Sequence, residues 1–345
     1  MATWPMAKPA RQSLSQCPVA DVGTYPTSQP TMSYTFKRSR PLFLLLAILF
    51  SVGPQVFAQE ESARIETQQR TSDLSQLKAG AVPAAEEVTD PELGDISLVT
   101  RVPRPRMFTF WTAQTFNFTS NAFLVRDNEQ NAFFWNGRIG ASYVPYATRN
   151  FTPRLTFEQD WFRYDRFSKL DFDSQTLQLD LKYDLTRDDT WFVNGSYSAS
   201  RLSSQHPSIG EFYRYGLANL SLTRFAQVGS APFYLGLTGG GYWRTGDASS
   251  SDRAAAFLNV LALYVLRENV QLTAFGRPEF QHYTHDPNGS REDFNLTVGA
   301  TITWNPREYL SLGATAAYIG NFSSVSERRY DLVTPSLIFG ARFAF

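Results

Sequence analysis

The most restrictive feature of this sequence is an alternation of apolar and polar residues that begins near Met107 and recurs to the end of the chain. In the stretch TLQLDLKYDL, Thr176 to Leu185, every second residue is Leu or Tyr, and the residues between them are polar. Successive side chains of a β-strand point to opposite faces, so each such stretch predicts a strand with one apolar and one polar face.

The alternation predicts about twelve strands, with ten or fourteen left open as alternatives because two stretches, 212–224 and 254–266, alternate poorly. Many of the stretches exceed the usual length of a globular strand, about 5–6 residues, and suit a tilted membrane strand of about 9–11 residues. The expected spans are 107–118, 132–145, 150–163, 174–185, 190–201, 212–224, 232–244, 254–266, 269–283, 293–304, 309–319 and 331–345. Because proline removes a hydrogen-bond donor from the sheet, we expect β-bulges or shifted strand boundaries at four positions: Pro153, Pro232, Pro278 and Pro335.

The connections between these stretches alternate in length. Four of them are short: YATRN, TRDD, REN and NPRE. The connections that alternate with these along the chain are longer and rich in Ser, Asp, Asn and Gly. Short turns at one end and long loops at the other are typical of an outer-membrane barrel, whose short turns face the periplasm. Aromatic residues make up 15% of the chain, and we expect those near strand ends to form two interfacial girdles: Trp161, Trp191, Trp243, Trp304, Tyr146 and Tyr309. The sequence therefore predicts an all-β fold, a transmembrane antiparallel β-barrel.

A soluble barrel or sandwich is the alternative, and it would place the apolar face of each strand on the inside. The polar parity argues against it, because it carries charged residues that suit a water-filled lumen better than a dry core. We expect these residues to line the pore: Arg138, Arg154, Glu158, Asp160, Asp180, Lys182, Arg277 and Glu279. Two interpretations stay open, a charged constriction that filters solutes and a set of paired charges that brace the lumen. Small inward residues at Ser311, Gly313, Thr315 and Ala317 favour some free space.

The N-terminal part predicts secretion. Lys37, Arg38 and Arg40 precede an apolar run from Leu42 to Val52, which is too short for a membrane helix and fits a cleaved signal peptide. We interpret residues 1–58 as the signal region, with Met32 as the true start, so that the single cysteine, Cys17, lies outside the mature chain. Residues 59–105 are polar and acidic and predict a mostly disordered periplasmic leader, and residues 106–345 form the expected barrel.

The last residues, GARFAF, resemble the C-terminal β-signal of bacterial outer-membrane β-barrel proteins, through Gly340, Phe343 and Phe345. The resemblance covers about ten residues and the hairpin layout, within the barrel architecture of that superfamily. It implies the outer membrane of a Gram-negative cell as the location and the barrel-assembly machinery as a partner. It names no substrate.

The expected function is a porin-like passive channel for small hydrophilic solutes. A closed barrel with a structural or binding role, acting through its outer loops, and a barrel-wall hydrolase are the alternatives. The hydrolase alternative depends on His282 near Ser290, without a surrounding catalytic motif, so we expect no enzyme activity. His282 and His285 would point to opposite faces of a strand, and His206 falls in a loop, so we expect no metal site and no cofactor.

The expected partners follow from the location. They are the lipids and lipopolysaccharide of the outer membrane, and peptidoglycan or a periplasmic partner that would bind residues 59–105. The formal net charge of zero and the lack of a basic stripe argue against nucleic acid.

Overall fold

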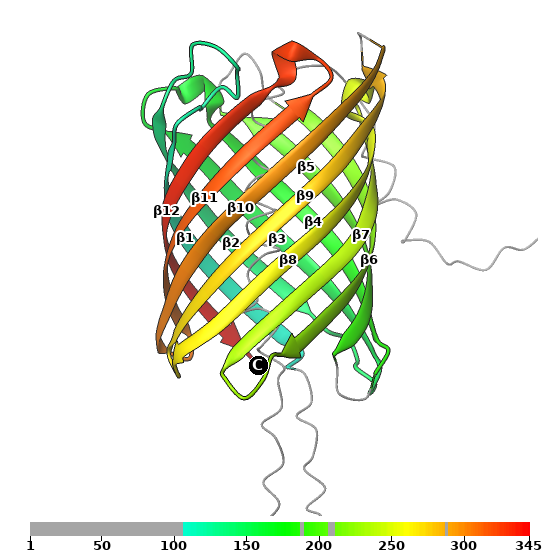
Figure 1. The fold of residues 1–345 in the computed structure, drawn as a ribbon, viewed down its shortest axis with the longest axis vertical. Helices are drawn as coiled ribbons and strands as arrows, with labels where there is room; N and C mark the ends of the chain where they lie inside the picture. The colour runs from blue at the N-terminus through cyan, green and yellow to red at the C-terminus, as the bar shows by residue number, and fades with distance from the viewer. Residues whose placement is uncertain (1–105, 187–189, 206–210, 287–288) are drawn as a thin grey trace, which may run out of the picture. The chain divides into compact units, whose positions relative to one another are not determined.

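The alternating stretches form a closed antiparallel barrel of twelve strands in the part of the chain that the structure describes (Figure 1). The computed structural model describes residues 106–186, 190–205, 211–286 and 289–345. The expected signal region 1–58, the start at Met32 and the leader 59–105 lie outside the described residues. The strands are β1 (Phe108–Thr119), β2 (Ala132–Tyr143), β3 (Phe151–Tyr164), β4 (Phe172–Asp184), β5 (Trp191–Ser204), β6 (Glu211–Gln227), β7 (Phe233–Gly246), β8 (Arg253–Arg267), β9 (Val270–Asp286), β10 (Gly289–Arg307), β11 (Leu310–Ser323) and β12 (Tyr330–Ala344).

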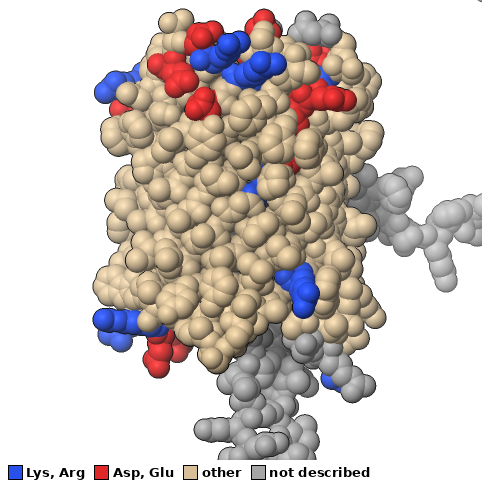
Figure 2. Space-filling model, viewed as in Figure 1, with Lys and Arg blue, Asp and Glu red and all other residues tan. Residues whose placement is uncertain are grey.

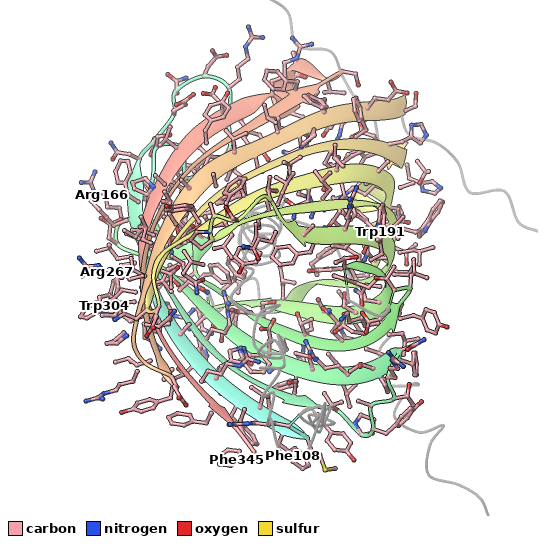
Figure 3. All side chains as sticks on the ribbon, turned by 60° about the horizontal axis from the view of Figure 1, so that its bottom comes forward. Phe108, Arg166, Trp191, Arg267, Trp304 and Phe345 are labelled. Carbon is pink, nitrogen blue, oxygen red and sulfur yellow. The ribbon has the colours of Figure 1, made fainter. Side chains whose placement is uncertain are left out.

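Each strand pairs with its neighbours in sequence, and β12 pairs with β1 to close the sheet. Thr109 lies opposite Ala344, and the backbone N–H of Phe345 donates to the carbonyl of Phe108 at 2.8 Å. Figure 3 shows these two ends of the barrel, Phe108 and Phe345, next to each other at one rim. Closure gives every strand two partners, which a β-structure needs in lipid because the hydrocarbon offers no hydrogen bonds.

The two ends of the barrel differ less in connection length than the sequence predicts, because the β2–β3 connection, 144–150, is as long as the β3–β4 connection, 165–171, at the other end. Turns such as 268–269 and 308–309 lie at the end that holds Phe108 and Phe345, and the longer β1–β2 connection, 120–131, lies at the opposite end. We call these the periplasmic and the outer end. Three short 3₁₀-helices lie in outer connections: η1 (Ser168–Leu170), η2 (Ser249–Ser251) and η3 (Ser326–Arg328). The expected long loop THDPNGSRE is instead mostly strand, since β9 runs to Asp286 and β10 begins at Gly289.

The outer surface of the barrel carries its apolar residues. Large side chains on the outward parity are exposed, among them Leu179, Leu220, Val298 and Leu337. Figure 2 shows a broad uncharged band around the middle of the visible face, with charged side chains gathered at the two ends. Trp191 and Trp304 point outward in Figure 3, as expected for girdle residues. No helix among the described residues is long and apolar enough to cross a membrane.

Three of the four prolines lie inside strands without the bulge that the sequence analysis expected. Pro278 lies opposite Leu296 in β10, and the register between β8 and β9 is the same on both sides of it. Near Pro278, the pairs that would join Leu258 to Pro278 and Asn259 to Arg277 are missing. The missing N–H therefore opens the sheet locally and leaves the register unchanged.

The other three prolines are also accommodated by local changes in strand pairing or strand boundary. Pro153 lies beyond the last β2–β3 pair at Leu155, and Pro335 lies beyond the last β1–β12 pair at Ser336. Past Pro335 the seam continues through Ser120, whose hydroxyl accepts a hydrogen bond from Val333 N–H at 3.0 Å. Pro232 precedes β7, so the shifted boundary expected there is correct.

Candidate functional site

The eight charged residues expected in the lumen all lie on the inward parity of their strands. In β3, Arg154 and Glu158 alternate with the exposed, lipid-facing Leu155 and Phe157. The pairing register then places Asp160 beside Arg138 of β2, and Asp180 of β4 beside Arg154. The strands thus bring the expected charges to the inner surface in two separate groups, one on β2–β4 and one on β9.

The first group, the β2–β4 wall, consists of Arg138, Arg154, Glu158, Asp160, Asp180, Lys182 and Asp184. Arg138 Nε contacts Asp160 Oδ1 at 2.9 Å, and both side chains are buried. Lys182 Nζ contacts Asp184 Oδ1 at 2.7 Å. Both pairs fit the bracing interpretation: Arg138 and Asp160 tie β2 to β3, and Lys182 and Asp184 pair two residues apart within β4.

The rest of the β2–β4 wall is more open. Arg154 is exposed, and Glu158, Asp180 and Lys182 are half-buried. Gln178 Nε2 donates to Asp180 Oδ1 at 2.7 Å, which orients that carboxylate. Accessible charges on an inner wall attract or repel ions inside the barrel, so this part of the wall fits the filtering interpretation.

The second group, the arginine–tyrosine wall, consists of Tyr242, Arg244, Arg253, Arg277, Glu279, Gln281, Tyr283, Asp286, Arg291 and Asp293. Glu279 lies at its centre and is fully buried. Its Oε2 accepts hydrogen bonds from Arg277 Nε and Nη2 at 3.0 and 2.8 Å. Its Oε1 accepts from Tyr242 Oη and Gln281 Nε2, both at 2.6 Å. Four charge-assisted bonds to one carboxylate hold this part of the wall rigidly.

The outer part of the arginine–tyrosine wall is organised around Arg291. Its guanidinium lies 3.4 Å from the centroid of the Tyr283 ring, and its Nη1 contacts Asp286 Oδ2 at 3.0 Å. Its Nε contacts Asp293 Oδ2 at 3.2 Å. Arg253 Nη1 donates to Tyr283 Oη at 3.2 Å, which links the two arginines through one phenol. All these side chains are buried, so this wall is bracing rather than accessible.

An apolar cluster lies inside the barrel at its outer end. Its buried members come from β2–β6 and from two outer connections: Ala122, Ala132, Phe162, Tyr164, Leu170, Phe172, Leu202 and Tyr213. Phe162 and Phe172 stack with centroids 4.2 Å apart. Phe123 of the β1–β2 connection meets Phe167 of the β3–β4 connection edge-on at 4.8 Å. These contacts, which we call the mouth cluster, draw two outer loops inward.

Hydrogen bonds hold the same loops. Asn121 Nδ2 donates to the carbonyls of Val125 and Asp331, at 2.6 and 3.3 Å, and thereby ties the β1–β2 connection to β12. Asp171 accepts a hydrogen bond from Tyr164 N–H at 2.7 Å. Burial raises the pKa of Asp171, against the opposing effect of that hydrogen bond and of Arg163. These hydrogen bonds hold the β1–β2 and β3–β4 connections in defined conformations.

Of the ten residues of the arginine–tyrosine wall, the sequence analysis predicted only Arg277 and Glu279. Arg253 lies one residue before an expected strand, and Asp286 and Arg291 lie beyond the ends of two others. Asp184 was also missed, although it shares the inward parity of Asp180 and Lys182. That parity was the signal that would have found Asp184.

The residues of the hydrolase alternative do not form a catalytic arrangement in the described part of the chain. His282 Nδ1 lies 3.8 Å from Glu292 Oε1, and both side chains are largely exposed. His285 Nδ1 lies 2.9 Å from the hydroxyl of Thr284. Within residues 106–345, excluding the undescribed gaps, no three His, Cys, Asp or Glu side chains are grouped as metal ligands.

Comparisons with known proteins find only distant structural likeness. No protein-family model and no curated protein matches the chain. Among solved structures, an outer-membrane channel from Pseudomonas putida F1 is 13% identical, with 76% of this chain and 100% of that chain covered and a TM-score of 0.48. The translocator domain of the autotransporter NalP from Neisseria meningitidis is 13% identical, with coverages of 84% and 99% and a TM-score of 0.45. The KdgM porin in complex with oligogalacturonate is 9% identical, with coverages of 68% and 99% and a TM-score of 0.39.

These likenesses are too distant to support a conclusion about function. The class of protein is therefore identified from the features of the barrel itself. They are an even number of antiparallel strands, closure, an apolar outer band and a polar inner surface. The chain is therefore an outer-membrane β-barrel.

Proposed function

We propose that this barrel is a passive, porin-like channel for small hydrophilic solutes. The observation that carries the proposal is the accessible part of the β2–β4 wall, where Arg154 is exposed and Glu158, Asp180 and Lys182 are half-buried. A barrel filled entirely by its own side chains would bury such charges in pairs, as the arginine–tyrosine wall does. Twelve strands lie between the filled barrels of about eight strands and the open porins of about sixteen to eighteen.

Conductance tests the proposal. Residues 59–345 would be refolded, checked for heat-modifiable migration, and inserted into a planar bilayer. We expect discrete current steps, and we expect the pair Glu158→Gln and Asp180→Asn to shift ion selectivity toward anions. Glu292→Gln is the matched control, because that carboxylate is largely exposed on the outward parity of β10. Folded barrels that give no current, or a selectivity shift of equal size in the control, would contradict the channel.

The mouth cluster favours a second function, a closed barrel that acts through its outer loops. Phe123→Ala distinguishes the two, because it removes the contact between two loops at the mouth. Under the channel proposal, the β1–β2 connection that holds Phe123 partly narrows the pore. Loosening this connection then increases the size of the existing current steps. Under the closed-barrel alternative, the wild type is silent and the variant opens it. Phe133→Ala, an exposed aromatic on the outward parity of β2, is the control.

The expected partners remain part of the proposal. We propose that the assembly machinery recognises Gly340, Phe343 and Phe345 on β12, whose pairing with β1 completes the barrel. Periplasmic partners of residues 59–105, including peptidoglycan, are proposed from the sequence alone. We propose no enzyme activity, metal or cofactor.

A further inference from the structure

An amide side chain lies in the middle of the lipid-facing surface of β1. Gln114 is six residues beyond Phe108 on the outward face of this strand, between Thr112 and Phe116. At a rise of about 3.3 Å per residue and a tilt of about 40°, it lies roughly 15 Å above the periplasmic end of the barrel. The apolar band of such barrels is about 25 Å tall, so hydrocarbon surrounds this position. A glutamine side chain is too short to reach water from this depth.

The outward neighbours of Gln114 offer its amide little. Its cross-strand partners are Phe339 of β12 and Gly137 of β2, and neither has a polar side chain. Thr112 lies next to it on the same face of β1, and the Thr112 hydroxyl already donates to the carbonyl of Arg138 at 3.0 Å. Lipid chains provide no hydrogen bonds either.

Trp135 of β2 fixes the direction of the amide. Its indole Nε1 donates to Gln114 Oε1 at 2.8 Å, and an indole can only donate. The amide oxygen therefore faces Trp135, and the amide nitrogen with its two N–H groups faces away. In the part of the chain that the structure describes, this is the one hydrogen bond of the Gln114 side chain. The Trp135 ring lies over Gly137, which has no Cβ to displace it.

The amide nitrogen needs an acceptor from outside the chain. Polar side chains inside a membrane bond to one another across protein contacts, because an unsatisfied donor is costly in hydrocarbon. A second copy of this chain brings the same amide, whose oxygen keeps one lone pair beside the bond from Trp135. Across a two-fold axis along the membrane normal, each Gln114 donates to the other, so one residue supplies both the donor and the acceptor.

Aromatic side chains surround the amide on this surface. Phe116 and Phe339 meet edge-on with centroids 6.1 Å apart, and Phe118 and Phe133 lie 5.1 Å apart. Phe116, Phe133 and Phe339 are all exposed. Protein interfaces are enriched in aromatic residues, and a central polar contact that aromatic side chains shield from its surroundings is typical of them.

A row of outward residues on β8–β11 shows the usual condition of a lipid-facing wall. The row is formed by alanine alone: Ala262, Ala274, Ala300 and Ala316. Alanine side chains leave no donor or acceptor in the hydrocarbon. The amide of Gln114 thus distinguishes the β1–β2 surface from this part of the wall.

We propose that the barrel forms a two-fold symmetric dimer through the outward surface of β1 and β2, with the Gln114 amides of the two copies bonded to each other at its centre. The dimer does not depend on whether the barrel conducts ions.

Energy transfer between labelled chains in lipid vesicles tests the dimer. Residues 59–345 contain no cysteine, so one introduced cysteine carries the donor or acceptor dye. Glu129→Cys labels the β1–β2 connection, and Ser249→Cys labels the β7–β8 connection, six strands away around the barrel; both residues are exposed. We expect energy transfer to rise with the protein-to-lipid ratio and to be stronger between Glu129 labels than between Ser249 labels.

The decisive variant is Gln114→Leu, which removes the amide and suits a lipid-facing position. We expect it to need at least a tenfold higher protein-to-lipid ratio for half-maximal energy transfer between Glu129 labels. Gln159→Leu is the matched control, because Gln159 is also an outward amide, and its Nε2 already donates to the carbonyl of Asp160 at 3.0 Å. We expect this control to associate like wild type. Heat-modifiable migration confirms folding of each variant, and Gln114→Met replaces the leucine variant if that one fails to fold.

Other results would overturn the proposal. Energy transfer no greater than random proximity gives would mean that lipid or a different protein covers Gln114. Association that Gln114→Leu leaves unchanged, or that Gln159→Leu weakens equally, would exclude the paired amides as its cause. Stronger transfer between Ser249 labels would place the contact on another face of the barrel.

Discussion

Arg277 donates two hydrogen bonds to Glu279, two residues farther along β9, and Glu279 accepts two more from Tyr242 and Gln281. Residues two apart on a strand share a face, so this ion pair needs no turn or loop to bring it together. The pair joins β7 to β9 across β8, because Tyr242 belongs to β7. Glu279 thus acts as a fastener between β7 and β9 on the inner surface.

Replacing Glu279 should destabilise the barrel strongly. Glu279→Gln leaves a buried guanidinium without its carboxylate, and breaking a buried ion pair costs about 3–5 kcal/mol. The measurement is urea unfolding in lipid vesicles, followed by tryptophan fluorescence. Glu292→Gln, the exposed carboxylate on the neighbouring strand, should change stability by less than about 0.5 kcal/mol. A similar small change in Glu279→Gln would contradict the fastener role.

The ion pair of Arg138 and Asp160 should show strong energetic coupling. Each single change, Arg138→Met or Asp160→Leu, leaves one buried charge, whereas the double change leaves none. We expect the double variant to be more stable than the sum of the single losses predicts, with a coupling energy of about 1–3 kcal/mol. Unfolding of wild type and the three variants under one condition measures it. Additive losses would show that the two charges act independently despite their 2.9 Å contact.

The strands and their faces could be predicted from the sequence because one solvent, lipid, selects one parity. Within the membrane, apolar residues face the lipid and the residues between them face inward. The eight expected lumen residues all lie on the inward face, as predicted. On the outer extensions of β9 and β10 both faces carry polar residues, so the apolar–polar alternation ends before the strand does. This is why Asp286 and Arg291, on the outer extensions of β9 and β10, were missed.

The partners of the lumen charges could not be predicted. The contact of Arg138 with Asp160 depends on the register between β2 and β3, which are joined by residues 144–150. A shift by two residues would keep every parity and pair Arg138 with Glu158 or Phe162 instead. The mouth cluster was also beyond the sequence, because Phe123 and Phe167 lie in connections with no periodic pattern.

The mouth cluster should contribute to stability as a core does in a soluble protein. Phe162→Ala removes a fully buried ring that stacks on Phe172, and such a truncation costs about 3–5 kcal/mol. Phe157→Ala, on the same strand, removes a ring that faces lipid, and we expect a loss of about 1 kcal/mol there. Unfolding in vesicles compares the two. Equal losses would show that the cluster is loosely packed.

The closing seam can be tested by disulfide formation, since residues 59–345 contain no cysteine. Thr112 lies opposite Ala341 across the β1–β12 seam, and direct cross-strand neighbours have Cα atoms about 4.5–5.5 Å apart, within the range of a disulfide. We expect Thr112→Cys with Ala341→Cys to crosslink on mild oxidation, seen as a barrel that no longer fully unfolds on heating in detergent. Thr112→Cys with Phe339→Cys is the control, because this diagonal separation of about 7–8 Å is too long. Efficient crosslinking in the control alone would mean that β12 closes the barrel in a register shifted by two residues.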